Sequence, residues 1–221
     1  MLARLLILGL FFSLAALRCQ AQFGVQVGGA ITAVKFTRNG TEADHGWNFR
    51  YNAGVLYRIR RLGGLKKIDL QPTLQYITKG SSDTDIPYRL PPNTVNEVYT
   101  RLHYVQASAP GLFRANEEGV KNITYNLGAG PYLASLVAAR AVSVGEGGNK
   151  APETPADMRI GNGTQDDIKR LDAGLTLYLS MKLGHVSSGV SYDYGLLNVS
   201  PRTNTSMYNR SFCIFFGYLL R

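Results

Sequence analysis

Two-residue alternation of apolar and polar side chains recurs along most of the chain and restricts the fold more than any other feature. It is clearest from 47 to 60, where Trp47, Phe49 and Tyr51 alternate with Asn48 and Arg50. Such alternation predicts a β-strand whose two faces meet different surroundings. Eight segments show it, at 23–35, 47–60, 68–77, 98–114, 122–136, 171–182, 186–196 and 211–220. Each has about 10 or more residues, the length that a tilted membrane strand requires.

The polarity of the two faces distinguishes a membrane barrel from a soluble one. One face carries a large apolar set with aromatic residues near the strand ends, and the other carries Arg, Asp, Lys, Asn, Gln and Gly. Inside a soluble eight-stranded barrel, the apolar set would overfill the narrow interior. If the apolar side chains face lipid, the lumen needs to hold only the smaller polar face, and the apolar groups lie in hydrocarbon. We therefore predict an all-β fold, an eight-stranded antiparallel up-and-down transmembrane β-barrel. The facing of the irregular fourth segment is left open.

The connections between these segments alternate between long and short. Long connections are predicted at 36–46, 79–97, 138–169 and 198–207, and short ones at 61–65, 115–121 and 183–185. Outer-membrane barrels have short periplasmic turns and longer extracellular loops. We therefore expect the two ends of the barrel domain on the periplasmic side and the four long loops outside the cell.

The first 21 residues have the three parts of a secretory signal peptide. Arg4 is followed by an apolar run at 5–17 and by Cys19-Gln20-Ala21, and this run is too short for a membrane-spanning helix. We expect cleavage after Ala21, which leaves residues 22–221 as one barrel domain. Lipidation of Cys19 is not expected, because Arg18 occupies a position that requires a small residue.

The part of the chain after Ala21 contains no uninterrupted apolar stretch of about 20 residues, so a helical membrane span is not available. If this part enters a membrane, it must do so as a closed barrel, because only helices and closed barrels satisfy every backbone polar group in lipid. We therefore expect the protein in the cell outer membrane.

The formal net charge is +9, from 24 Lys and Arg against 15 Asp and Glu. Loss of Arg4 and Arg18 with the signal peptide would lower it to +7. The basic residues are scattered and the protein is exported, so we expect outer-membrane lipid as a partner and no nucleic acid. Only Cys213 remains after cleavage, which excludes an intrachain disulfide. We expect a monomer.

Short motifs along the barrel domain resemble those of a known family. They are 23–29 (FGVQVGG), 70–76 (LQPTLQY), 127–132 (LGAGPY), 171–175 (LDAGL), 192–196 (YDYGL) and 217–219 (GYL). Taken in order, they are similar to the PorT-like outer-membrane β-barrel family of the Bacteroidota, over essentially the whole domain. The resemblance implies an eight-stranded outer-membrane barrel. The best-known member takes part in protein secretion and gliding, but most members have no assigned activity, so the resemblance leaves envelope or secretion-system proteins open as partners.

His185 and Ser187 form the most suggestive catalytic fragment. A His and a Ser two residues apart on one strand face could act as base and nucleophile, as in outer-membrane lipid deacylases. Such enzymes need the pair in the lipid-facing outer leaflet together with an orienting carboxylate, whereas this pair falls at a predicted periplasmic turn. We therefore expect no enzyme, and we assign no catalytic, cofactor-binding or metal-binding residue.

Charged residues of both signs are candidates for the inner face. They are Arg50, Arg58, Asp69, Lys79, Arg101, His103, Asp172, Lys182 and Asp193. Eight strands leave an interior that side chains can fill, and buried charges must be paired. We therefore expect an ion-pair network that plugs the barrel.

The resulting interpretation is a small integral outer-membrane protein, either an anchor whose external loops, chiefly 138–169 and 79–97, carry any binding, or an envelope or secretion-system accessory. Three alternatives remain open: a narrow polar pore, a soluble lipocalin-like barrel with an internal ligand, and an outer-membrane lipid hydrolase.

Overall fold

The computed structural model describes residues 21–38, 40–43, 46–60, 65, 67–83, 95–115, 123–145, 154–163 and 165–220. Residues 1–20, which hold nearly all of the predicted signal peptide, lie outside these ranges, as do the middle parts of several predicted connections. Within the described ranges, no helix is both long enough and apolar enough to cross a membrane.

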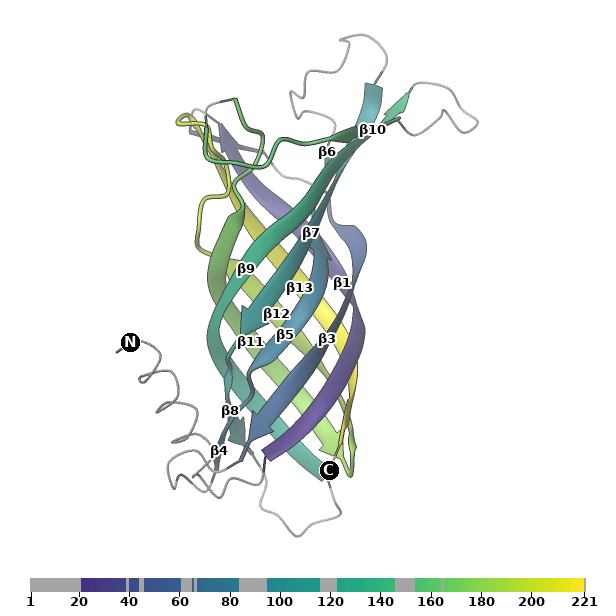
Figure 1. Ribbon diagram of the computed structural model, residues 1–221, viewed down its shortest axis with the longest axis vertical. Coiled ribbons are helices and arrows are strands. Elements are labelled where there is room, and N and C mark those ends of the chain that lie inside the picture. Colours follow the sequence, from purple (N-terminus) through teal and green to yellow (C-terminus); the bar gives the residue numbers. More distant parts are fainter. Residues whose placement is uncertain are drawn as a thin grey trace, which may run out of the picture.

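Eight antiparallel wall strands close into a barrel (Figure 1). The described ranges contain thirteen strand segments: β1 (Ala21–Arg38), β2 (Thr41–Ala43), β3 (Asn48–Ile59), β4 (Ile68–Leu70), β5 (Thr73–Lys79), β6 (Ser82–Asp83), β7 (Val95–Ser108), β8 (Gly111–Arg114), β9 (Ile123–Gly145), β10 (Thr154–Asp157), β11 (Leu171–Leu183), β12 (Val186–Gly195) and β13 (Thr205–Leu219). The eight wall strands are β1, β3, β4 with β5, β7 with β8, β9, β11, β12 and β13. Neighbours in the chain pair around the wall, and the pairing of β1 with β13 closes the ring. The predicted fold class is therefore confirmed.

Two of the eight wall strands are each interrupted once. β4 and β5 are separated at Gln71 and Pro72, and β7 and β8 at Ala109 and Pro110, because proline has no N–H to donate to a ladder. Backbone hydrogen bonds continue across both interruptions, from Tyr57 N to Pro72 O at 2.9 Å and from Gln71 N to Pro110 O at 3.0 Å. Each pair therefore forms one continuous section of the wall.

The short connection between β11 and β12 is confirmed as a tight turn. Gly184 lies between the paired residues Leu183 and Val186 with φ at +58°, a left-handed conformation that suits glycine. Two-residue hairpin turns require such conformations, because their twist matches that of the flanking strands. The turn lies at the same end of the barrel as the C-terminus, opposite β6 and β10 (Figure 1).

The predicted loop 138–169 is wrong over its first part. β9 continues to Gly145, pairs with β7 from Tyr132 to Gly145 and pairs with β10 near its end. The pairing of β7 with β9 shifts register between His103 and Tyr104. β-bulges commonly cause such a shift. The alternation of apolar and polar residues along β9 is interrupted at this shift. The sequence pattern therefore ends near residue 136, although the strand continues. The predicted connections 36–46 and 79–97 likewise begin inside β1 and β5.

The outward face of the barrel is apolar and the inward face is largely polar. β11 shows this along its whole length, since Leu175, Leu177 and Leu179 are exposed while Asp172 and Ser180 are buried inside. β13 alternates in the same way. An apolar belt around a closed ring suits hydrocarbon, where no backbone group can be left without a hydrogen bond. The soluble lipocalin-like alternative is therefore excluded, and the protein is a transmembrane barrel of the outer membrane.

Arg101 and His103, two candidates for the inner face, point outward instead. Their strand β7 buries Leu102 and Tyr104 on the inward face, and alternation along the strand therefore directs Arg101 and His103 outward.

We expect the cost of a charge on the outer face to depend on its depth. Leu177→Arg, near the middle of β11 and 54% exposed, should lower the free energy of unfolding by about 2–4 kcal/mol. Leu196→Arg, just past the end of β12, should cost about 0–1 kcal/mol. Urea unfolding in lipid vesicles measures both values. Equal costs would show that Leu177 does not face the hydrocarbon.

Candidate functional site

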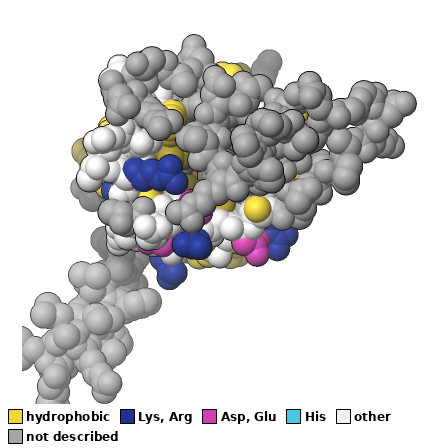
Figure 2. All heavy atoms as spheres, turned by 90° about the horizontal axis from the view of Figure 1, so that it is seen from above, with side chains coloured by type: hydrophobic (Ala, Val, Ile, Leu, Met, Phe, Trp, Pro, Cys, Tyr) yellow, Lys and Arg dark blue, Asp and Glu magenta, His cyan; other side chains and the backbone are white. Residues whose placement is uncertain are grey.

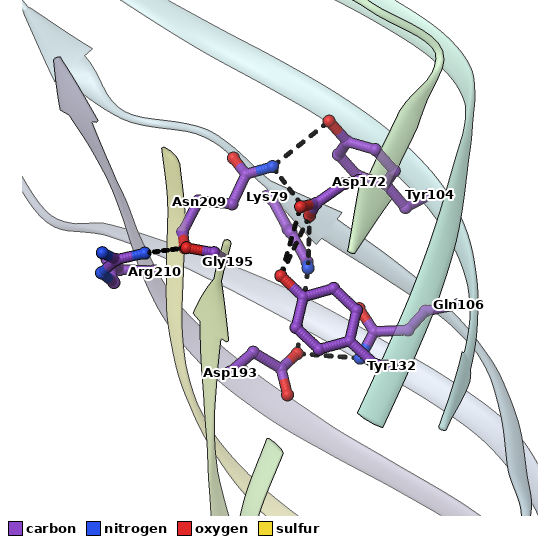
Figure 3. A network of polar contacts seen from close by, with 9 residues as sticks. All are labelled: Lys79, Tyr104, Gln106, Tyr132, Asp172, Asp193, Gly195, Asn209 and Arg210. Atoms are coloured by element: carbon purple, nitrogen blue, oxygen red, sulfur yellow. Dashed lines mark hydrogen bonds and ion pairs between the residues drawn. The ribbon is translucent and has the colours of Figure 1, made fainter. Parts of the chain in front are cut away.

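The interior of the barrel holds a buried ion-pair network centred on Lys79 (Figure 3). Lys79 Nζ lies 3.1 Å from Asp172 Oδ2 and 3.8 Å from Asp193 Oδ2. The side chains of these three residues are at most 3% exposed. Alternation along β5, β11 and β12 places each of them on the inward face, and closure of the ring brings them together.

Neutral donors stabilise the second negative charge of this network. Asp172 accepts hydrogen bonds from Asn209 Nδ2 at 2.9 Å and from the Tyr132 hydroxyl at 3.2 Å. Asp193 accepts one from Gln106 Nε2 at 2.8 Å. Because one ammonium cannot fully offset two carboxylates in a medium of low dielectric constant, these hydrogen bonds supply further stabilisation.

Two aromatic rings complete the surroundings of the ammonium group. Lys79 Nζ lies 4.4 Å from the centroid of the Tyr132 ring and 5.4 Å from that of Tyr104. A ring face attracts a cation within about 6 Å. The network thus draws side chains from β5, β7, β9, β11, β12 and β13, six strands that it joins across the lumen.

A second network lies toward the short-turn end. Arg58 donates from Nε to Asp69 Oδ2 at 3.0 Å, and Arg114 Nε lies 3.4 Å from Asp69 Oδ1. Arg58 also donates to Asn126 Oδ1, and Asn126 donates in turn to Ser180 Oγ at 3.1 Å. This cluster has two cations and one anion, whereas the Lys79 network has one cation and two anions. The six charges together balance.

Further contacts fill the lumen between and below these networks. Gln26 donates to Gln75 at 3.0 Å, and Gln71 donates to the Tyr178 hydroxyl at 3.0 Å. The Tyr178 ring stacks on Phe215 with centroids 4.8 Å apart. Near the short-turn end, Lys182 donates to Gln22 at 3.0 Å. These contacts match the predicted plug of paired polar groups.

The sequence prediction missed an apolar layer above the Lys79 network. Ile77, Leu102 and Leu136 point into the barrel near its long-loop end. Met158, Ile168 and Val199 come from the connecting segments and are buried in the same cluster. The only sequence signal was an apolar residue at an inward position, as at Ile77. The contribution of the connecting segments follows from no local pattern.

Of the nine charged residues predicted inside, six are buried there: Arg58, Asp69, Lys79, Asp172, Lys182 and Asp193. Arg101 and His103 lie outside. Arg50 is half-buried, and its guanidinium donates to the backbone oxygens of Phe49 and Thr100, both at 3.0 Å. The structure thus brings five of the nine into the two networks, places Lys182 near the short-turn end and leaves the other three outside the networks.

The His185 and Ser187 side chains take different directions. His185 Nδ1 lies 2.9 Å from the backbone oxygen of Leu219, and its ring stacks on Tyr218. Ser187 is buried on the inward face of β12. Cys213 is a buried free thiol within the apolar cluster.

Comparison with known proteins identifies no family. No protein-family model matches the chain, and no curated protein matches its sequence. Similar solved structures include OprG from Pseudomonas aeruginosa, with 9% identity, TM-score 0.43 and coverage of 91% of this chain and 96% of that one. Neisserial surface protein A has 16% identity, TM-score 0.42 and coverage of 90% and 97%. Ail of Yersinia pestis has 11% identity, TM-score 0.40 and coverage of 90% and 99%.

We expect Lys79→Met to destabilise the barrel strongly. It would leave Asp172 and Asp193 without their shared cation, which should lower the free energy of unfolding by about 3–5 kcal/mol. Adding Asp172→Asn should restore part of the loss. Lys35→Met removes the same charge from an exposed position and should cost less than about 0.5 kcal/mol. Urea unfolding measures all three. Similar stabilities for the Lys79 and Lys35 variants would contradict a structural role of the network.

Proposed function

We propose that the protein is a closed, non-conducting outer-membrane anchor that holds its external hairpins for binding and has no enzymatic activity. The observation that carries this proposal is the occupied lumen. Two charge networks and an apolar layer succeed one another along the barrel axis, and each draws side chains from several strands. A transported molecule would have to displace buried ion pairs, which is costly. The binding function is therefore assigned to the outside.

The external hairpins are the part of the molecule suited to a partner. β9 has 23 residues, more than the about 10 that a barrel strand needs to cross a membrane. Its outer end pairs with both β7 and β10 and extends past the wall (Figure 1). This pairing gives the hairpin a rigid base. An envelope protein is the class of partner that we propose.

The absence of enzymatic activity is supported by the surroundings of His185 and Ser187. The imidazole contacts a backbone oxygen and an aromatic ring, and the serine faces the lumen. A general base must lie within hydrogen-bond reach of its nucleophile. Both residues also lie at the short-turn end, away from the outer leaflet.

We further propose membership of the PorT-like family and a role as an accessory of an envelope or secretion system. Two of the motifs that carry the resemblance, 171–175 and 192–196, supply Asp172 and Asp193, the two carboxylates that hold Lys79. A third, 127–132, supplies Tyr132. The resemblance therefore includes residues that close the lumen, which supports a shared interior as well as a shared fold.

We expect the wild-type protein to leave ion flux unchanged when it is reconstituted into lipid vesicles. The reason is that the lumen is filled by paired side chains. Flux of a potassium-sensitive dye system is the readout, with insertion verified by the heat-dependent gel mobility of protein recovered from the vesicles. Flux that rises in proportion to inserted protein would support the pore instead.

Replacing residues 146–157 by a short Gly-Ser linker tests the binding role. This change removes β10 and is expected to abolish cross-linking of the protein to other envelope proteins on whole cells, because the hairpin loses its outer strand. The control replaces Gly184-His185 by Asn-Gly at the opposite end and should leave the cross-links intact. Cross-links that persist in the β10 variant, or vanish in both, would contradict the assignment to the hairpin.

A further inference from the structure

Basic side chains lie at several separate places around the long-loop end of the barrel (Figure 2). One group borders a cavity of about 510 Å³ in the outer wall, between β3, β5, β7 and β9. The residues that line it are Phe49, Arg50, Tyr51, Thr78, Arg101, His103, Arg140 and Val142. Because Tyr51, Arg101 and Arg140 are exposed on the outward face, the cavity opens sideways, toward the surrounding membrane.

Three guanidinium groups converge on this cavity. Arg101 on β7 and Arg140 on β9 are direct cross-strand partners, so two like charges lie side by side on the outward face. The charges of Arg50, Arg101 and Arg140 all act on the His103 ring, and Arg101 also acts on Arg50. Asp157 pairs with Arg140 at 3.1 Å.

One of the hydrogen-bond donors of the Arg50 side chain, Nε, has no acceptor within the described residues. Its two terminal nitrogens donate to the backbone oxygens of Phe49 and Thr100. Its Nε is buried and makes no hydrogen bond within the described part of the chain. A buried donor without a partner carries a free-energy cost, which an anion in the cavity would remove.

Along the barrel axis, the cavity lies at the edge of the apolar belt that is nearer the long loops. Along the outward face of β7, exposed Val105 is followed by His103 and then by Arg101. Along β9, exposed Leu133 and Val137 are followed by Arg140. Both strands therefore change from apolar to basic at the level where Arg101 and Arg140 pair.

Aromatic side chains mark the same boundary. Tyr51 and Tyr76 are exposed, with ring centroids 6.2 Å apart, and the Tyr76 hydroxyl bonds to His103 Nδ1. Tyrosine and tryptophan are enriched at the level of lipid headgroups. Since the long-loop end faces outward, the cavity lies at the headgroups of the outer leaflet.

We propose that this cavity binds the phosphomonoester of a phosphorylated lipid headgroup in the outer leaflet. Arginine forks match phosphate oxygens, and the three guanidinium groups at this cavity offer several such donors to one phosphate. The sideways opening at the edge of the apolar belt fits a headgroup whose acyl chains lie against Val105, Leu133 and Val137. A dissolved anion would gain no such contact.

The test measures lipid binding to the detergent-solubilised full-length protein by native mass spectrometry. The probes are a bis-phosphorylated lipid A, the same lipid without its phosphates, and inorganic phosphate. The wild-type protein is expected to bind the bis-phosphorylated lipid about 30-fold more tightly than Arg101→Gln/Arg140→Gln. Removing the phosphates from the lipid should weaken binding to the wild type by a similar factor.

The matched control is Arg159→Gln/Arg170→Gln. These two exposed arginines belong to the same end of the protein and do not line the cavity, so the variant loses the same two charges and should bind within about twofold of the wild type. Equal losses in both variants would mean unspecific attraction and would overturn the site. Inorganic phosphate that binds as tightly as the lipid would overturn the lipid as its ligand. Heat-dependent gel mobility verifies that each variant is folded.

Discussion

The whole structure depends on the requirement that no backbone N–H or C=O group be left without a hydrogen bond in hydrocarbon. A strand can meet it only with a partner on each side, so the sheet must close, and β1 pairs with β13 to close it. Closure then assigns one face of every strand to lipid and the other to a narrow lumen. The apolar belt and the polar interior follow from this single constraint.

Closure also places charged side chains in a lumen of low dielectric constant. Six of these charges form two clusters, and the positive and negative charges are equal in number over the two. Asp69 stands between Arg58 and Arg114 near one end, and Lys79 stands between Asp172 and Asp193 further along. Neither cluster is neutral by itself. Hydrogen bonds from tyrosine and amide side chains support the excess charge of the Lys79 network, and they also join strands that make no direct contact in the sheet. The interior thus fixes the relative positions of strands on opposite sides of the barrel.

The prolines show how the wall tolerates residues that cannot donate. Pro72 and Pro110 lie in adjacent wall strands, and each keeps its place because its carbonyl still accepts a hydrogen bond from a neighbour. Each proline removes one hydrogen bond from the ladder on one side, but the adjacent strands remain paired. The outward basic cavity lies higher on these same strands, where β7 and β9 leave the apolar belt. Placement of the arginines there reflects the change of surroundings from hydrocarbon to headgroup.

Sequence alone determined the number of strands, their faces and the alternation of short and long connections. These properties are local, since each strand repeats every two residues and lipid imposes the same demand on all of them. Alternation on β11 and β12 placed Asp172 and Asp193 inside without any knowledge of their partners. It did not settle the facing of 98–114, where small residues at 107–111 carry no contrast, and the candidates Arg101 and His103 point outward.

Only the tertiary structure decided which inward residues meet. Lys79 and Asp172 are 93 residues apart in the chain, and their contact depends on the stagger between strands, which alternation does not contain. The apolar layer of Met158, Ile168 and Val199 also depends on how the connecting segments fold back over the barrel. The outward arginine cavity needed both the closed wall and the register of β7 with β9. Local periodicity specifies the face of a side chain, whereas its neighbours across the barrel are specified by the shear of the closed sheet.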